Sequence, residues 1–173
     1  VGAHLVRDPR TSMIAFTGSK AVGLDIVSAA GTTPQSQPFV KQVVCEMGGK
    51  NAIIIDASAD LDEAVLAVRQ SAFGFQGQKC SACSRVIVVE SAAETFAHRL
   101  EESIRSLTIG DPLEPGTDIG PVIDQESADK IRSYIEIGKQ EGKLAVGLTV
   151  PEGLEAKVGK SFIAPHFFTG IKP

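Results

Sequence analysis

The sequence lacks the features that mark membrane proteins and secreted proteins. No apolar run approaches the roughly 20 residues that a membrane-spanning helix needs, and no charged segment followed by an apolar core marks a secretory signal. The chain has only three cysteines, so they cannot all pair in disulfides. These absences exclude a membrane span and a disulfide framework, and they favour the reducing cytoplasm as the location.

The sequence also has no basic cluster, no internal repeat and no low-complexity segment. Its 17 Lys and Arg residues are dispersed among 21 Asp and Glu residues, for a net charge of −4, which excludes a nucleic-acid-binding footprint. The 173 residues, 43% of them hydrophobic, suffice for one sizeable core or for a domain plus part of another. Because the chain starts at Val1 rather than methionine, and stops at Pro173 just after a strand-like run, we expect a piece of a longer protein.

Strand-like and helix-like segments alternate along most of the chain. Apolar, β-branched runs predict strands, and apolar residues at helical spacing predict helices. The expected strands are 12–17, 42–47, 51–56, 84–90, 143–147 and 161–168, and the expected helices are 20–30, 61–72, 91–104 and 124–142. This alternation indicates an α/β fold with a largely parallel sheet.

Shorter patterns predict the helix ends and the buried faces. Asp60 with Glu63, and Ser91 with Glu94, have the spacing of a capping box, and Gly31 suits a helix C-cap. The residues expected to face inward are Val22, Ile26 and Val27, then Leu61, Val65, Val68 and Ala72, then Phe96, Leu100 and Ile104, and finally Ile131, Tyr134 and Ile135.

The stretch FTGSKAVG (16–23) leads from an expected strand into a helix. Gly18 and Ser19 at the helix N-terminus would offer free N–H groups and a hydroxyl, which suit a phosphate. Lys20 excludes the G-x-G-x-x-G dinucleotide fingerprint, and Leu24 excludes a P-loop. A plain tight turn into a helix explains the stretch equally well.

The stretch VVCEMGGKN (43–51) places a carboxylate at the end of an apolar strand. Glu46 in a cleft would suit a general base, whereas the simpler interpretation pairs Glu46 with Lys50. Cys45 is expected on the opposite side of the strand, packed as a small hydrophobic residue.

The stretch FGFQGQKCSACSR (73–85) holds the other two cysteines. Cys80 follows Lys79 in a glycine-containing turn, where positive charge and backbone N–H dipoles favour the nucleophilic thiolate. Taken alone, the stretch favours a structural pair of small, half-buried cysteines. A dithiol redox pair of Cys80 and Cys83 is an alternative. A zinc site would need two more ligands, and Cys45 and the histidines lack ligand spacing, so we expect no metal.

Three motifs in order, FTGSxxxG, EMGGKN and GQKCS, resemble the aldehyde dehydrogenase superfamily. The separation of Glu46 from Cys80 is similar to the family's separation of base and nucleophile. Lys79-Cys80-Ser81 is similar to the pyrroline-5-carboxylate (glutamate semialdehyde) dehydrogenase branch. The resemblance implies a three-layer fold with helices on both faces of the sheet. Residues 1–46 would end a Rossmann-like NAD-binding domain, and 47–173 would form most of the catalytic domain.

The resemblance also implies roles for named residues. Cys80 would attack the aldehyde carbon, its backbone N–H would serve the oxyanion hole, and Glu46 would activate the water that hydrolyses the thioester. Lys79 and Ser81 would hold the α-carboxylate of glutamate semialdehyde. The residues expected to contact NAD are Gly18, Ser19, Gly23, Met47 and Gly48.

The remaining expectations concern partners and alternatives. The resemblance implies a small aldehyde substrate, NAD with NADP left open, the rest of a parent chain, and a homo-oligomer. Cys83 stands where the branch often has a small residue without a thiol, which suggests reversible disulfide formation with Cys80. The competing hypotheses are a non-catalytic fold unit serving assembly and the dithiol redox protein.

Overall fold

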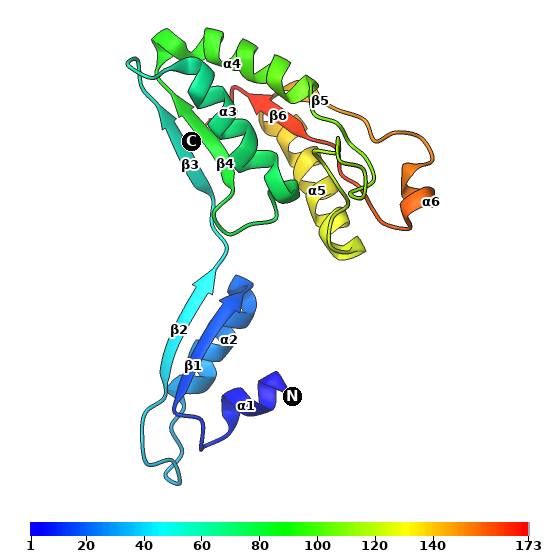
Figure 1. Ribbon diagram of the computed structural model, residues 1–173. Helices are drawn as coiled ribbons and strands as arrows, with labels where there is room; N and C mark the ends of the chain where they lie inside the picture. Colours follow the sequence, from blue (N-terminus) through cyan, green and yellow to red (C-terminus); the bar gives the residue numbers. More distant parts are fainter. Residues whose placement is uncertain (173) are drawn as a thin grey trace. The chain divides into compact units, whose positions relative to one another are not determined.

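The computed structural model describes residues 1–172 and divides the chain into two compact units, Val1–Gly49 and Lys50–Pro173. Figure 1 colours both along the sequence, and each unit is described by itself. Helices and strands alternate through most of both units, as the sequence predicts.

The first unit is a pair of parallel strands with a helix packed on one face. Its elements are α1 (Gly2–Arg7), β1 (Met13–Gly18), α2 (Lys20–Gly31) and β2 (Gln42–Met47). The register runs from Met13 opposite Gln42 to Gly18 opposite Met47. The strands thus end together at one edge, and α2 starts from that edge.

The face that helix α2 buries is only partly the one predicted. Ile26 is buried as predicted, together with Gly23 and Ala30, whereas Val22 and Val27 are about half exposed. The helix packs closely at Gly23, where a Cβ would lie 2.7 Å from the Sδ atom of Met47. Close packing therefore selects glycine at this position, and the two valines lie outward.

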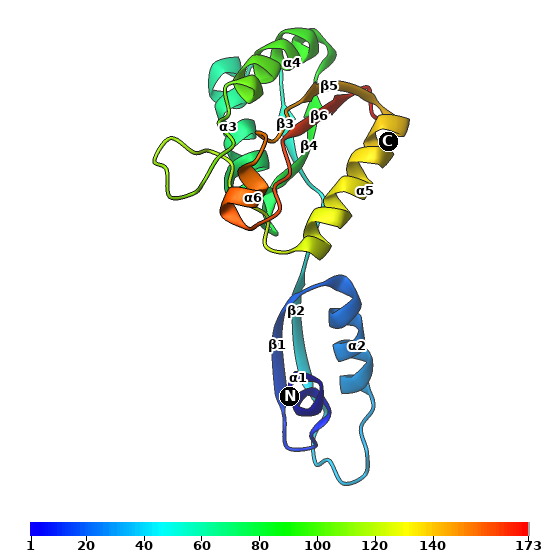
Figure 2. The same cartoon turned by 90° about the vertical axis from the view of Figure 1, so that its right-hand side faces the viewer.

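The second unit contains a parallel pair and an antiparallel pair of strands (Figures 1 and 2). Its elements are β3 (Asn51–Ile55), α3 (Leu61–Phe73), a turn at Gly74–Gly77, β4 (Cys83–Val88), α4 (Glu90–Arg105), α5 (Gln125–Glu141), β5 (Lys143–Gly147), α6 (Leu154–Val158) and β6 (His166–Thr169). β3 pairs in parallel with β4, and β5 pairs antiparallel with β6.

The main core of the second unit lies where α3 and α4 cover one face of β3 and β4. Its fully buried members are Ile55, Val65, Val68, Phe96, Leu100, Ile104 and Val146. A second cluster gathers Ile109, Ile119, Leu154, Phe162 and Ala164. The inward residues predicted for α4 are all in the first cluster, because its apolar positions repeat at strict helical spacing.

Four further local predictions were wrong. Gly31, expected as a C-cap, is the last residue of α2, and Thr32 is the C-cap. Ser91 does not cap α4: the helix begins at Glu90, because the backbone N–H of Val89 still bonds to Ile55 at the end of β3 (3.1 Å). The last strand is shorter than predicted, since residues 161–165 form a largely buried loop before β6. Tyr134, expected inside, is exposed on α5.

No helix within residues 1–172 has the length and apolar character needed to cross a membrane.

The Asp60 cap is confirmed and offers a test of the fold around α3. Its Oδ1 accepts the backbone N–H groups of Asp62 (2.9 Å) and Glu63 (3.3 Å). We expect Asp60→Ala to lower the free energy of unfolding by about 1 kcal/mol, because two N–H groups lose their acceptor. Asp60→Asn, which keeps an acceptor, should lose much less in chemical denaturation. Equal losses in the two variants would contradict the capping role.

Candidate active site

The turn between α3 and β4 has an unusual backbone. Phe75, Gln76 and Gly77 have φ values of 56°, 55° and 66°, three consecutive residues in the left-handed region. Only glycine suits the third position, since a Cβ there would lie 2.8 Å from the backbone oxygen of Ala72. Each non-glycine residue in this region costs about 1–3 kcal/mol, and such strain clusters at functional sites. We call residues 74–82 the Cys80 turn.

Side chains from outside the turn, and from the turn itself, fix its path. Asn51 at the start of β3 donates its amide to the backbone oxygen of Cys80 (2.6 Å). Gln78 Oε1 accepts the backbone N–H of Ile123 (3.0 Å). The Ser71 hydroxyl accepts the N–H of Cys83 (3.2 Å). The turn is therefore attached to β3, to α3 and to the segment that precedes α5.

The structure separates the two cysteines of the CSAC motif. Cys80 is exposed, together with its neighbours Lys79 and Ser81. Cys83 is buried at the start of β4 and donates its S–H to the backbone oxygen of Arg85 (3.2 Å). The two thiols are thus not an equivalent half-buried pair, and only Cys80 meets solvent freely.

Lys79 belongs to the Cys80 turn, and its side chain reaches Phe75 of the same turn. Its Nζ lies 5.8 Å from the centroid of the Phe75 ring, within reach of a cation–π contact. The exposed turn thus carries a positive charge at the residue before an accessible thiol.

The predicted cofactor residues gather at one edge of the first unit. Gly18 ends β1 and lies in register with Met47, which ends β2; Ser19 and Gly48 follow them directly. Glu46, opposite Thr17, is exposed at the same edge. The carboxyl ends of parallel strands are where α/β sheets bind ligands.

The start of α2 fits a phosphate group. Ser19 is the N-cap, and its Oγ accepts the N–H of Val22 (3.4 Å). The first-turn N–H groups of this 12-residue helix have no partner within the helix. Gly18 packs against the Phe16 ring, which a Cβ there would meet at 2.5 Å, so packing within the unit requires glycine at this position. This edge therefore fits the pyrophosphate of a dinucleotide.

Cys45 takes the place expected of it. It lies on the opposite side of β2 from Glu46, partly buried, with its Sγ 3.8 Å from the backbone oxygen of Gly23 on α2. It therefore packs as a small residue between strand and helix.

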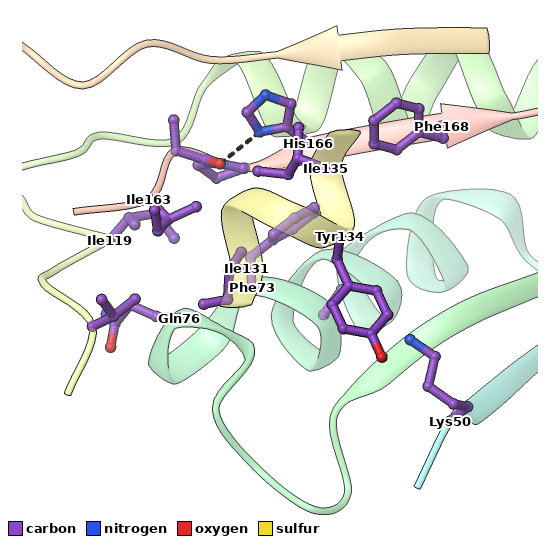
Figure 3. Close-up of a pocket in the computed structure, with 14 residues that line it drawn as sticks. Lys50, Phe73, Gln76, Ile119, Ile131, Tyr134, Ile135, Ile163, His166 and Phe168 are labelled. Carbon is purple, nitrogen blue, oxygen red and sulfur yellow. Dashed lines mark hydrogen bonds between the residues drawn. The ribbon is translucent and has the colours of Figure 1, made fainter. Parts of the chain in front are cut away.

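The second unit also contains a cavity of about 300 Å³ that sequence reasoning missed (Figure 3). Ile131 and Ile135 of α5 line it, and His166 bonds through Nδ1 to the backbone oxygen of Ala164 (2.8 Å). Lys50 lies over the Tyr134 ring at its mouth, 5.6 Å from the centroid. The feature of the sequence that could have predicted the cavity is the spacing of Ile131 and Ile135, which places both on one face of α5. Cys80 is not among the lining residues.

Within residues 1–172, no group of three or more His, Cys, Asp or Glu side chains is placed to hold a metal ion.

A family model described as "Aldehyde dehydrogenase family" matches residues 1–173, the whole chain. The chain belongs to the aldehyde dehydrogenase family. It is 48% identical over all 173 residues to the 1-pyrroline-5-carboxylate dehydrogenase of Geobacillus thermodenitrificans, and 49% identical to that of Geobacillus kaustophilus. It spans 33% of the length of each of these relatives.

Solved structures of this family have the same fold. The 1-pyrroline-5-carboxylate dehydrogenase of Thermus thermophilus matches with a TM-score of 0.89 and 46% identity, over 99% of this chain and 32% of that one. A Thermus 1-pyrroline-5-carboxylate dehydrogenase with bound NAD matches equally well. Proline utilization A from Bdellovibrio bacteriovorus matches with a TM-score of 0.89 and 46% sequence identity, over 96% of this chain and 17% of that one. The α/β fold class is confirmed.

The N-cap of α5, Asp124, gives a prediction about pH. Asp124 follows Ile123, and hydrogen bonds from the backbone N–H and the hydroxyl of Ser127 hold the pKa of Asp124 below its ordinary value. A carboxyl group with a lowered pKa stabilises the fold above its unfolded pKa, about 3.9, and the contribution disappears as the pH falls through its folded value.

We therefore expect Asp124→Asn to reduce the free energy of unfolding more at pH 6 than at about pH 2, where wild-type Asp124 is increasingly protonated. Denaturation at a series of pH values measures the difference. A constant difference over that range would show that the charge of Asp124 contributes nothing.

Proposed function

We propose that this chain carries the reacting residues of a dehydrogenase that oxidises L-glutamate γ-semialdehyde to L-glutamate, in proline catabolism. The observation that carries the proposal is the sequence identity of 48–49%, over all 173 residues of this chain, with 1-pyrroline-5-carboxylate dehydrogenases. The exposed Lys79-Cys80-Ser81 triplet on a strained turn supports it. Because the chain spans 33% of those relatives, the activity belongs to a longer protein.

The proposed reaction begins at Cys80. Its thiolate attacks the aldehyde carbon to form a thiohemiacetal, whose oxygen accepts the backbone N–H of Cys80. Loss of hydride from the carbon of the thiohemiacetal leaves a thioester on the same sulfur. Glu46 then removes a proton from the water that attacks the thioester. The C–S bond breaks, L-glutamate leaves, and the Cys80 thiolate is restored.

The proposed cofactor edge lies in the first unit. NAD, when bound, supplies the acceptor for the hydride. Gly18 and Ser19 would hold its pyrophosphate at the start of α2, with Gly23 allowing the helix to pack closely, and the Met47-Gly48 turn would lie against the nicotinamide. The N-terminus of α2, which follows the ends of β1 and β2, supports this assignment. Assays with NAD and with NADP decide between the two cofactors.

The proposed substrate contacts flank the nucleophile. Lys79 would pair with the α-carboxylate of the substrate, and Ser81 would donate a hydrogen bond to it. Both side chains are exposed beside Cys80, which supports the assignment. A fixed charge on this side would orient the semialdehyde with its carbonyl toward the sulfur.

The wider setting is proposed on the same grounds. Residues 1–46 are assigned to the NAD-binding domain and 47–173 to the catalytic domain, and the division of compact units after Gly49 supports a boundary in this region. We expect a cytoplasmic homo-oligomer of a longer chain. We also expect the 173-residue chain to have little or no NAD-dependent turnover in isolation.

Replacement of Glu46 tests the mechanism in the complete protein. Glu46→Gln should still form the thioester, because that step needs Cys80 and the hydride acceptor. Hydrolysis should slow by about 10²–10⁴-fold, since no base activates the water. Stopped-flow absorbance should then show a burst of about one NADH per subunit, followed by slow turnover. Cys80→Ala, as the control, should show no burst. Steady-state turnover of Glu46→Gln close to wild type would exclude Glu46 as the base.

Cysteine labelling separates the dehydrogenase from the rival hypotheses. We expect iodoacetamide to label Cys80 much faster than Cys83, because Cys80 is exposed and Cys83 is buried. Peptide mass spectrometry measures each rate. Slow labelling of both thiols would favour a structural role, and a Cys80–Cys83 disulfide formed on mild oxidation would favour the dithiol hypothesis.

A further inference from the structure

We propose that Asn51, Gln76 and Gln78 are positioning residues that hold Cys80 in its reactive place. This inference rests on the proposed function, since it assumes that Cys80 is the nucleophile. None of the three has a role in the proposed chemistry, although all lie within or beside the motifs that carry it. Asn51 bonds to the backbone of the Cys80 turn, whereas Gln76 and Gln78 attach the turn through their own side chains to the segment before α5.

The turn needs external anchors because its backbone is strained. Phe75 and Gln76 are held in the left-handed region, which L-residues leave readily when nothing constrains them. The turn is also largely exposed from Lys79 to Ser81, so apolar packing there is sparse. Hydrogen bonds are therefore the main constraint on where the Cys80 sulfur points.

Two anchors lead to the segment before α5. Gln78 Oε1 accepts the N–H of Ile123 (3.0 Å). Gln76, with its amide turned to satisfy both neighbours, accepts the N–H of Gly120 (2.8 Å) and donates to the oxygen of Phe75 (3.3 Å). A Cβ on buried Gly120 would lie 3.3 Å from the terminal amide group of Gln76, so the glycine permits this close approach.

The third anchor acts on Cys80 itself. Asn51 Nδ2 donates to the backbone oxygens of Cys80 (2.6 Å) and Ala82 (3.4 Å). Asn51 is itself fixed, since its backbone oxygen accepts the Ser84 hydroxyl (3.3 Å) and it pairs with Cys83 in the β3–β4 ladder. The anchors thus bracket the nucleophile: Gln78 holds the chain before Cys80, and Asn51 holds it at Cys80 and beyond.

The residues that hold the turn are therefore different from the residue that reacts. The anchors use the side chain of Gln78 before Cys80 and the backbone oxygens of Cys80 and Ala82, and they leave the Cys80 side chain exposed. A loosened anchor would misplace the sulfur without removing a substrate contact. Misplacement by about 1 Å can lower the rate by about 10²-fold. The expected effect is therefore on kcat and on thiol reactivity, with KM little changed.

The test uses the complete protein that contains this chain. Gln78→Met keeps the length of the side chain and removes the acceptor for Ile123, and Asn51→Ala removes the donor to Cys80. We expect both to lower kcat by about ten- to a hundredfold and to slow iodoacetamide labelling of Cys80. Gln78→Glu restores an acceptor and should recover much of the lost kcat.

Matched controls separate positioning from folding. Gln125→Met removes hydrogen bonds to Asp129 and from Ser161 elsewhere in the same unit. Ser106→Ala removes the hydrogen bond from the Ser106 hydroxyl to the backbone oxygen of Ser103, at the end of α4 and away from the turn. Both controls should retain the wild-type kcat, and all variants should unfold at similar denaturant concentrations.

Four results would overturn the inference or its basis. Wild-type kcat in both Gln78→Met and Asn51→Ala would overturn the positioning role. A rise in KM at constant kcat would do so too, since it would indicate uniform binding. A fall in kcat that tracks lost stability and is not recovered by Gln78→Glu would assign the residues to folding alone. Wild-type protein without dehydrogenase activity would instead overturn the proposed function.

Discussion

The left-handed turn at Phe75, Gln76 and Gly77 is the constraint on which the candidate site depends. It ends α3, reverses the chain and brings Cys80 to the surface before β4 begins. Such a backbone persists only where its surroundings over-determine it. Here the surroundings are side-chain amides, from Asn51 and from Gln78, that satisfy or use backbone groups. Side-chain hydrogen bonds therefore fix the position of Cys80, on a unit whose core is apolar.

The proposed cofactor edge, at the ends of β1 and β2, is formed in a different way. At the ends of β1 and β2 the positions are set by parallel register and by close packing, with Gly23 allowing α2 to lie against Met47. No strained residue is needed there, because a helix N-terminus already supplies the N–H groups that a phosphate requires. The chain thus combines a regular edge suited to binding with an irregular turn suited to reaction.

The sequence predicted most elements because local and global signals agree in them. Strands 42–47 and 143–147 and the Asp60 cap are confirmed by β2, β5 and α3. The errors arose where tertiary contacts outweigh a local pattern. Val22 and Val27 look more buried than Gly23, yet close packing selects the small residue. Likewise Ser91 has the spacing of a capping residue, but the N-cap is Val89, whose N–H bonds to Ile55 of β3, and α4 begins at Glu90. The roles of Glu46 and Lys79 stay predictions.

The two cysteines show why spacing alone could not find the site. A C-x-x-C motif treats its members alike, and nothing in the letters CSAC says where the turn stops and the strand starts. In the structure that boundary falls at Cys83, because its N–H bonds to Ser71 and its residue pairs with Asn51. Burial then follows for Cys83, while Cys80, three residues earlier, remains in the exposed turn. The chemical difference between two identical residues therefore arises from the position of a strand end.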